Sequence, residues 1–291
     1  MIGTQYTERA HAKLNLTLDV GPRRDDGYHE IDSIVVRISP FDEISVAIRP
    51  GTGRVRSIVK DKRPDALADP PLPKGTSNLA HRAAELALEA WMPGEPADVW
   101  VTLVKRIPVE SGLGAGSSDA ASVLRSMAKA TGRTVEESMS LGAMLGSDVN
   151  LFLAEGPVRM RGRGERVELA TAVPHLVGVV VRPTEGVSTA AAYAALDARE
   201  RTPGRRTANW IDNPNQGDFP FGNDFEVAVR ATHSQVDAAF ARLESLGASP
   251  ILLCGSGSCV FGGAPNSETA VRLVAALAPH FPWIKKVETL P

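Results

Sequence analysis

The chain has 291 residues, of which 43% are hydrophobic, so it can bury the core of one large domain or two of ordinary size. Its 34 acidic and 32 basic residues give a formal net charge of −2, and the basic residues are dispersed, so we expect no nucleic-acid partner. The longest apolar runs, such as residues 176–181, are far shorter than the roughly 20 residues that cross a bilayer, so we expect no membrane segment.

The N-terminal residues and the cysteines indicate the cellular compartment. Residues 1–13 mix charged and polar side chains and contain no apolar core followed by a cleavage site, so we expect no secretory signal and a cytoplasmic protein. Cys254 and Cys259 are too few for a disulfide framework and form no CxxC pair, which agrees with a reducing compartment. The histidines form no paired-ligand motif, so we expect no metal site built by the protein alone.

The first part of the chain is predicted to be rich in β-strands. Residues 12–20 alternate strictly between apolar and polar, which is the period of a half-buried strand with Lys13 and Asn15 on its polar face. A helix is expected at residues 78–91, and an irregular segment with four prolines at residues 60–76. Stretches rich in β-branched residues predict further strands at residues 31–38, 44–48 and 99–104.

The period becomes helical from Ser118 onward. Apolar residues between 120 and 128 form one stripe, with Ser117 or Ser118 as the expected N-cap and Gly132 as the stop. Thr134 and Glu137 have the spacing of a capping box, which predicts a second helix that ends near Gly146.

A domain boundary is expected near residue 166. Residues 158–168 carry two glycines among charged residues, and residues 176–181 then predict a fully buried strand. We therefore expect an N-terminal domain at residues 1–166 and a C-terminal domain at residues 167–291. Within the second domain we expect an irregular connection at 197–222, helices at 224–246 and 266–279, and strands at 251–253 and 259–261.

The segment PVESGLGAGSS, residues 108–118, is a glycine-rich loop between a predicted strand and a predicted helix. Its small residues allow backbone N–H groups to converge on an anion at the helix N-terminus. It is not a Walker A loop, because Ser117 rather than Lys follows Gly116, and its glycine spacing is not GxGxxG. A plain turn is the alternative, but three alternating glycines and two serines exceed what a turn needs. We predict a phosphate-binding loop of Pro108, Val109, Glu110, Ser111, Gly112, Leu113, Gly114, Ala115, Gly116, Ser117 and Ser118.

This loop resembles the nucleotide loop of the GHMP small-molecule kinases. The resemblance runs from about residue 10 to residue 262, and the segment DGYHE at residues 26–30 is its most specific part. Further segments follow in the order typical of the family: Ala12–Leu16, Gly27–Glu30, Leu145–Val149, Gly162–Glu165, Val187–Thr189, Asn223–Glu226 and Gly255–Gly257.

The resemblance implies a two-domain α+β fold, with a β-rich N-terminal domain whose glycine loop leads into a helix and a smaller α+β C-terminal domain. It implies a kinase that uses ATP and Mg²⁺ and phosphorylates the 2-hydroxyl of 4-diphosphocytidyl-2-C-methylerythritol, a small molecule of the non-mevalonate (MEP) isoprenoid pathway. We expect a monomer or a weak homodimer. Sibling kinases for mevalonate, homoserine or a sugar are alternatives, as is a nucleotide-binding sensor that has lost catalysis.

The resemblance assigns Lys13 and Asp148 as the catalytic pair. By its residue type alone, Asp148 is also a suitable N-cap for residues 149–153, and Lys13 is also a suitable solvated side chain. An ammonium beside Asp148 keeps the carboxylate ionised and stabilises an emerging alkoxide, so the pairing is physically coherent. Retention of both residues argues against the inactive sensor.

The remaining candidate residues are implied mainly by the same resemblance. Tyr28 and His29 would supply a stacking face and hydrogen bonds for cytosine, which the sibling kinases do not need, and Tyr193 would cover the other face. A capped turn is the alternative for the first two. Ser117 or Ser118 would ligate nucleotide-bound Mg²⁺. Further expected substrate contacts are Asn15, Thr189, Gly255 and Ser256, and the weaker nucleotide contacts are Asn78, Lys105 and Asp119.

Three positions depart from the family pattern. Asn150 stands where Pro is usual, Ala115 where Gly is usual, and Cys254 where Ser or Thr is usual. The first would alter how the segment carrying Asp148 enters its helix. The last would remove a hydroxyl from the substrate pocket.

Overall fold

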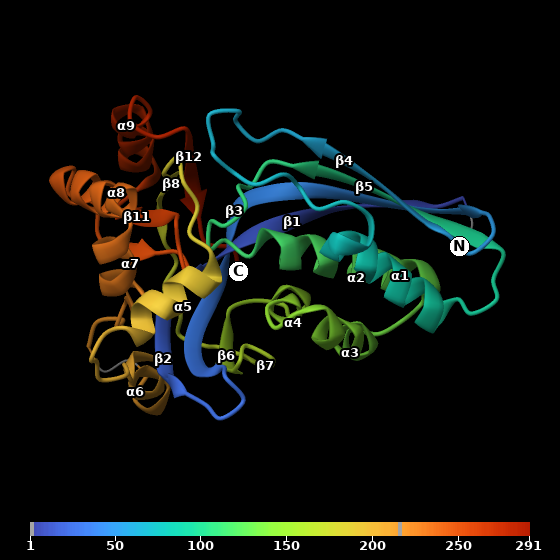
Figure 1. The fold of residues 1–291 in the computed structure, drawn as a ribbon, viewed down its shortest axis with the longest axis horizontal. Coiled ribbons are helices and arrows are strands. Elements are labelled where there is room, and N and C mark those ends of the chain that lie inside the picture. The colour runs from blue at the N-terminus through green and yellow to red at the C-terminus, as the bar shows by residue number, and fades with distance from the viewer. Residues whose placement is uncertain (1–2, 215–216) are drawn as a thin grey trace.

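The computed structural model describes residues 3–214 and 217–291 and folds them around two β-sheets (Figure 1). The first sheet has strand order β4-β5-β3-β2-β9, while β1 and β6 also pair with β3 and β7 pairs with β6. Its strands are β1 (Gln5–Asn15), β2 (Thr17–Arg23), β3 (His29–Pro50), β4 (Val55–Asp61), β5 (Ala97–Lys105), β6 (Val158–Gly162), β7 (Arg166–Leu169) and β9 (Gly222–Asn223).

A layer of helices covers one face of the first sheet (Figure 1). Their small and branched residues, such as Ala83 and Leu124, pack against sheet residues such as Val46 and Val101 and exclude water from this core. The elements are the 3₁₀ turn η1 (Gly75–Ser77), α1 (Leu79–Trp91), α2 (Ala115–Thr131), α3 (Val135–Leu145) and α4 (Val149–Leu153).

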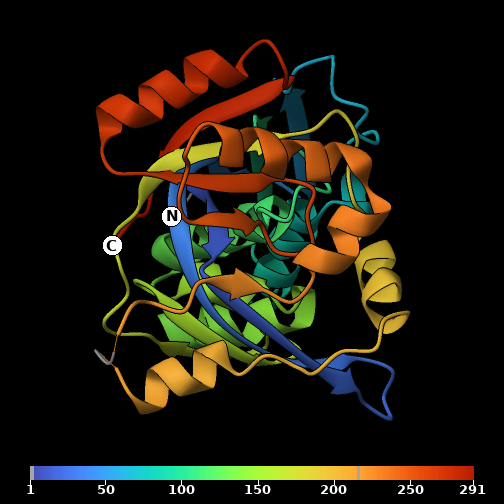
Figure 2. The ribbon, with the colours of Figure 1, turned by 90° about the vertical axis from the view of Figure 1, so that its left-hand side faces the viewer.

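The second sheet has strand order β10-β11-β8-β12, and all its pairings are antiparallel. Figure 2 shows two of its helices, α8 in orange and α9 in red, lying across the sheet. The strands are β8 (Val177–Arg182), β10 (Ile251–Leu253), β11 (Val260–Ala264) and β12 (Trp283–Glu288). The helices in this half of the chain are α5 (Thr189–Asp197), α6 (Arg206–Asp212), α7 (Glu226–Thr232), α8 (Ser234–Ser245) and α9 (Ser267–Leu277), of which α6 packs against β2 and β3 of the first sheet.

Alternating residues of β8 join the two halves of the molecule. Val179 and Val181 are fully buried in the core beneath α8 and α9, whereas Val180 is buried in a third core that includes Leu14 and Ile34 of the first sheet. Because both faces of β8 are covered, its uninterrupted apolar sequence is the pattern expected of a buried strand. The cores therefore fix the second sheet against the first.

The structure revises several of the expected strands. The strand predicted at residues 12–20 is interrupted at Leu16 between β1 and β2, and its polar face is buried rather than solvated. Thr17 there shares a 2.7 Å hydrogen bond with Thr207, and Asp19 accepts one from the Thr207 backbone N–H. The strands predicted at 31–38 and 44–48 are parts of the single long strand β3.

The structure also revises some of the expected helix ends. Ser117 and Ser118 are not the N-cap of α2, because the helix already starts at Ala115 and Gly114 takes the cap position in the left-handed region. Gly132 ends α2 as predicted, and the capping box of Thr134 and Glu137 begins α3. The helix predicted at 224–246 is divided into α7 and α8, because His233 has an extended backbone.

Two segments predicted to be irregular contain regular structure. The connection at 197–222 includes the helix α6, and its residues 215–216 lie outside the described residues. The proline-rich segment at 60–76 overlaps the end of β4 and the first two residues of η1. Within the described part of the chain, none of the helices combines the length and the apolar character that a bilayer span requires.

Candidate active site

A cleft of about 1130 Å³ lies at the junction of the two sheets and takes residues from both. It brings together many of the residues that the sequence singled out. Those that line it are Lys13, Asn15, Tyr28, His29, Pro108, Val109, Glu110, Ser111, Gly112, Gly114, Ala115, Gly116, Ser117, Asp148, Thr189, Tyr193, Gly255 and Ser256, whereas Asn78, Lys105, Leu113, Ser118 and Asp119 are not among its lining residues.

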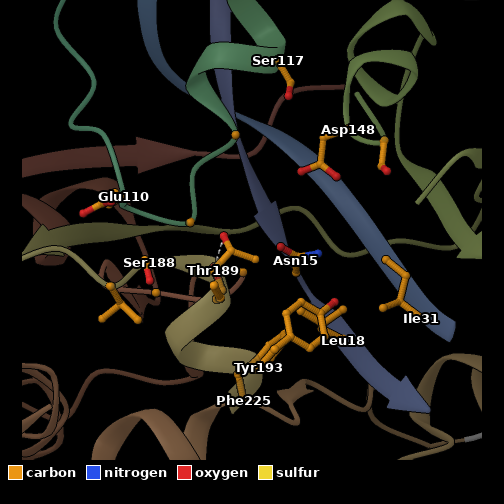
Figure 3. A pocket seen from close by; sticks show the side chains of 18 of the residues that line it. Asn15, Leu18, Ile31, Glu110, Ser117, Asp148, Ser188, Thr189, Tyr193 and Phe225 are labelled. Carbon is orange, nitrogen blue, oxygen red and sulfur yellow. Dashed lines mark hydrogen bonds between the residues drawn. The ribbon is translucent and has the colours of Figure 1, made fainter. Parts of the chain in front are cut away.

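The glycine loop leads directly into α2, and the N-terminus of this helix lines the cleft. Gly112 and Gly114 have φ values of 74° and 68°, which side chains with a Cβ rarely adopt, so the loop can turn sharply into the helix. Leu113 is buried, and its carbonyl accepts a 3.0 Å hydrogen bond from the backbone N–H of Lys13. The first N–H groups of α2 and the Ser117 side chain, which projects into the cleft in Figure 3, therefore form a ready anion site.

The glycine loop interlocks with residues 254–257 of the second domain. A Cβ added at Gly112 would lie 1.6 Å from the carbonyl oxygen of Cys254, so no other residue fits without displacing backbone. A Cβ added at Gly255 would lie 2.7 Å from Lys13 Nζ. Asn223 holds the segment by donating from Nδ2 to the carbonyls of Leu253 and Gly255 at 2.8 and 2.7 Å. Both domains thus build the centre of the cleft.

Lys13 presents a buried ammonium to the cleft. Its Nζ donates a 2.5 Å hydrogen bond to Asn15 Oδ1, and Asn15 Nδ2 donates to Ser33 Oγ at 2.8 Å. Burial lowers the pKa of Lys13, and the charge of the Asp148 carboxylate opposes that shift. The amide of Asn15 is therefore engaged in orienting Lys13, and its expected contact with substrate stays a prediction.

Asp148 occupies the N-cap position of α4, but its side chain makes no capping hydrogen bond. Its backbone is helical rather than extended (φ −86°, ψ −3°), which is not the geometry of a capping residue. The half-buried carboxylate instead points into the cleft (Figure 3) and lies beside the turn at Gly164. The local structure leaves this carboxylate available for a ligand.

The other end of the cleft is apolar and aromatic. Tyr193 lies there with Leu18, Ile31 and Phe225 (Figure 3), and its ring meets Phe225 edge to face with centroids 4.8 Å apart. Burial raises the pKa of the Tyr193 hydroxyl to about 12, so the side chain is neutral. Its ring also stacks on His29, with centroids 4.9 Å apart. His29 and Tyr193 thus form one wall.

Tyr28 lies in the turn between β2 and β3 and is 55% exposed. The guanidinium of Arg163 lies 4.6 Å above the centre of its ring. Such an exposed aromatic contributes little to the core, so the interpretation in which Tyr28 merely packs a turn is not favoured. Near the glycine loop, the hydroxyls of Thr189 and Ser256 share a 3.1 Å hydrogen bond across the mouth of the cleft.

Asn78 and Lys105 have structural partners outside the cleft. Asn78 caps α1 by accepting from the Ala80 N–H. Lys105 is buried and donates to Asp42 at 2.6 Å and to Asp119 at 2.7 Å, which connects the strand before the glycine loop with the helix after it. Burial disfavours the charge of Lys105, but Asp119 and Asp42 outweigh it and raise its pKa. Burial also raises the pKa of Asp119, to about 7.

The three departures from the family pattern have different surroundings. Cys254 is fully buried and does not line the cleft, so a hydroxyl there would not face the substrate pocket as expected. Ala115 is the first residue of α2 and lines the cleft. The side-chain Oδ1 of Asn150, in α4, approaches Gly142 of α3 and has no hydrogen-bond partner among the described residues.

The cleft also contains residues that the sequence reasoning did not assign. Arg163 and Phe225 belong to segments quoted for the resemblance, so the motifs already contained their signal. Asp197 follows Tyr193 by one helical turn and lies 3.3 Å from His29 Nε2, and that spacing could have identified it. Arg23, whose Nε donates to the Gly27 carbonyl, carried no comparable signal.

Comparisons with known proteins agree with this architecture. Residues 78–156 match the family described as GHMP kinases N terminal domain, and residues 212–282 match GHMP kinases C terminal. The chain is 37% identical, over 97% of its length and 98% of the relative's, to 4-diphosphocytidyl-2-C-methyl-D-erythritol kinase of Moorella thermoacetica. It is 34% identical to the protein of the same name from Bacillus velezensis, over 88% of this chain and 86% of that protein.

Solved structures show the same similarity. A crystal structure of 4-(cytidine 5'-diphospho)-2C-methyl-D-erythritol kinase superposes with a TM-score of 0.76 at 31% identity, covering 98% of this chain and all of the other. The L. major mevalonate kinase, crystallised with R-mevalonate, has a TM-score of 0.70 at 17% identity, covering 99% of this chain and 97% of that one. The second similarity concerns the fold alone.

Replacing Lys105 tests whether this residue is structural. Lys105→Met should lower the free energy of unfolding by about 3–5 kcal/mol, because it leaves the carboxylates of Asp42 and Asp119 buried without their cation. Urea denaturation measures this loss. As a control, Lys129→Met removes an exposed ion pair with Glu8 and should cost at most about 1 kcal/mol. A stable Lys105→Met protein that has lost ATP binding would instead identify Lys105 as a nucleotide contact.

Proposed function

The chain belongs to the GHMP kinase family, and within it to the 4-diphosphocytidyl-2-C-methyl-D-erythritol kinases. We propose that Asp148 and Lys13 are the catalytic residues that assist transfer of the γ-phosphoryl group from ATP to the 2-hydroxyl of 4-diphosphocytidyl-2-C-methyl-D-erythritol, the cytidylyl substrate. The protein is thus a small-molecule kinase of the non-mevalonate (MEP) isoprenoid pathway. The main support for these catalytic roles is that the Asp148 carboxylate projects into the cleft and makes no capping hydrogen bond.

In the proposed reaction Asp148 is the general base. It accepts the proton of the 2-hydroxyl as that oxygen forms its bond to the γ-phosphorus, and ADP leaves with the electrons of the broken bond. The nearby charge of Asp148 opposes the lowering of the Lys13 pKa that burial causes, and the Lys13 ammonium offsets the negative charge that develops on the acceptor oxygen. The hydrogen bond to Asn15 holds that ammonium in place before the substrate arrives.

ATP is proposed to bind at the glycine loop, with its phosphates at the N-terminus of α2. This helix has no acidic residue in its first turn, so nothing there repels an anion. Among the described residues no cluster of three His, Cys, Asp or Glu side chains could hold a metal alone. The Ser117 hydroxyl nevertheless fits Mg²⁺, which keeps few protein ligands and takes its other oxygens from phosphate and water. When bound with ATP, Mg²⁺ would neutralise phosphate charge.

The acceptor is proposed to lie at the aromatic end of the cleft. Tyr28 and the wall of His29 and Tyr193 offer ring faces that suit a pyrimidine base, whereas both ring nitrogens of His29 are engaged, Nδ1 with the Gly21 carbonyl at 2.9 Å and Nε2 with the Asp197 carboxylate at 3.3 Å. Thr189, Gly255 and Ser256 lie toward the glycine loop and would contact the diphosphate. Mevalonate, homoserine and simple sugars contain no base that would use these aromatic residues, so this end of the cleft favours the cytidylyl substrate over theirs.

Three further expectations are retained as proposals. The domain boundary near residue 166 is compatible with the two sheets, although β7 at Arg166–Leu169 still pairs within the first sheet. A monomer or weak homodimer and a cytoplasmic location remain predictions.

A coupled ADP-release assay tests the proposed function. The purified protein is given ATP, Mg²⁺ and one acceptor at a time: the cytidylyl substrate, mevalonate, homoserine or galactose. We expect turnover with the cytidylyl substrate that exceeds turnover with the others by orders of magnitude. Equal or greater turnover with mevalonate, homoserine or galactose would contradict the assignment, and no turnover with any acceptor would favour an inactive nucleotide sensor.

Replacing the proposed base tests its role directly. Asp148→Asn preserves the shape of the side chain but removes its basicity, so kcat should fall by about 10²- to 10⁴-fold. Because the carboxylate makes no capping hydrogen bond, the melting temperature should remain close to that of the unchanged protein. ATP affinity, measured by calorimetry without acceptor, should also persist. A variant that retains most of its kcat would exclude Asp148 as the base.

Tyr28 tests the recognition of cytosine. Tyr28→Ala should remove a stacking contact worth roughly 1–3 kcal/mol and raise the KM for the cytidylyl substrate about 5- to 150-fold. ATP affinity and the melting temperature should barely change, because the side chain is exposed. Tyr28→Phe is the matched control and should be nearly neutral, since the ring face remains. If Tyr28→Ala weakened ATP and the cytidylyl substrate equally, the stacking role would be wrong.

A further inference from the structure

A buried carboxylate outside the cleft holds the first residues of the glycine loop. Asp69 lies in the proline-rich segment between β4 and α1, and its side chain is only 4% exposed. Its Oδ2 accepts a 2.8 Å hydrogen bond from Arg63 Nη1 and a 3.1 Å hydrogen bond from the backbone N–H of Val109. Its Oδ1 accepts a 2.6 Å hydrogen bond from Arg182 Nη2. One carboxylate therefore joins the proline-rich segment, the glycine loop and the second sheet.

Arg182, the last residue of β8, completes this arrangement. It is fully buried, and its Nη2 also donates to the Val109 carbonyl at 3.3 Å. Its Nη1 donates to the carbonyls of Pro183 and Glu185. Asp69 and Arg182 thus bind the N–H and the carbonyl of the same loop residue, Val109. Such a pair of contacts fixes the position and the orientation of a peptide segment.

The residue held next is Glu110, whose backbone is strained. Its φ of 48° is in the left-handed region, which non-glycine residues rarely adopt. Its carbonyl accepts hydrogen bonds from the backbone N–H groups of Val187 and Ser258, both at 3.2 Å. Strain of this kind persists only where the surroundings over-determine the conformation. Asp69 and Arg182 constrain Glu110 from one side, because they hold Val109, the residue directly before it.

We propose that Asp69 is a positioning residue for the nucleotide site, which it reaches only through Val109. The inference rests on the proposed binding of ATP at the glycine loop. Asp69 does not line the cleft, whereas Val109 and Glu110 do. By fixing where the loop begins, Asp69 sets where the following backbone N–H groups meet the phosphates, and a displacement of about 1 Å is enough to weaken such binding strongly. Among the described residues, the side chain of Asp69 accepts hydrogen bonds only from Arg63, Val109 and Arg182, so it makes none with the aromatic end of the cleft.

The alternative is that the ion pairs of Asp69 only stabilise the fold. Asp61 provides a matched control, because it also accepts hydrogen bonds from Arg63, at 3.0 and 2.8 Å, but its side chain makes no hydrogen bond to the described loop residues and is 47% exposed. Asp69→Asn keeps the size of the side chain but replaces one of its two acceptor oxygens by an NH₂ group, which only donates. Because Arg182 and Val109 donate to different oxygens of Asp69, one of these two hydrogen bonds must be lost. Asp61→Asn makes the same chemical change beside the same arginine.

The experiment compares KM values for ATP and for the cytidylyl substrate in the full-length protein. Asp69→Asn should raise the KM for ATP about 10- to 100-fold, with a matching loss of ATP affinity in calorimetry, and change the KM for the acceptor less than about threefold. Asp61→Asn should change neither. Asp69→Glu, which keeps the carboxylate, should recover part of the ATP affinity. Equal changes in both KM values, or a lowered melting temperature with unchanged KM values, would overturn the proposal.

A second variant covers the case in which Asp69→Asn does not fold. Arg182→Lys keeps a cation beside Asp69 but lacks the planar fork that also reaches the Val109 carbonyl, so it should raise the KM for ATP selectively. An unchanged KM for ATP in this variant would overturn the proposal. Failure of the proposed function would be recognised separately, because the unchanged protein would then release ADP no faster with the cytidylyl substrate than with mevalonate, homoserine or galactose.

Discussion

The contact between Gly112 and the Cys254 carbonyl is the constraint on which the site depends. The two backbones approach so closely that even a methyl group at residue 112 would overlap the carbonyl oxygen. This contact joins the glycine loop of the first domain to the segment of Gly255 and Ser256 in the second. Lys13 is fixed at the same place, because its backbone donates to Leu113 and its ammonium lies against Gly255. The phosphate end, the catalytic pair and the acceptor end thus share one anchor.

Much of the fold was predictable because local signals agreed with the tertiary structure. The capping box at Thr134, the stop at Gly132 and the apolar run of β8 each specify one local geometry, and each has it. The error at residues 12–20 has a physical cause. A period of two identifies the strand and its faces, but it does not reveal that the second domain covers the polar face. Thr17 and Asp19 are buried because Thr207, far along the chain, supplies their partners.

The site was predictable only as far as its motifs extend. The glycine loop carries a local signal, since its small residues and its place before a helix suit an anion. Asp148 had no such signal, because an Asp before a short helix is more often a cap. Its role rests on the resemblance and on the absence of a capping hydrogen bond. Asp42, a partner of Lys105, and Arg182, a partner of Asp69, lie 63 and 113 residues away along the chain, so these contacts had to come from the fold.

The most direct test of this account measures ATP affinity and turnover in Gly112→Ala beside Gly132→Ala. Both glycines have φ near 70°, but a Cβ at Gly132 meets nothing within 4 Å, so the second variant carries the conformational strain without the collision. We predict that Gly132→Ala remains active with modestly lower stability. Gly112→Ala should lose ATP affinity and kcat/KM for the cytidylyl substrate together, because the shared anchor is displaced. Unchanged affinity and turnover in a folded Gly112→Ala protein would contradict the account.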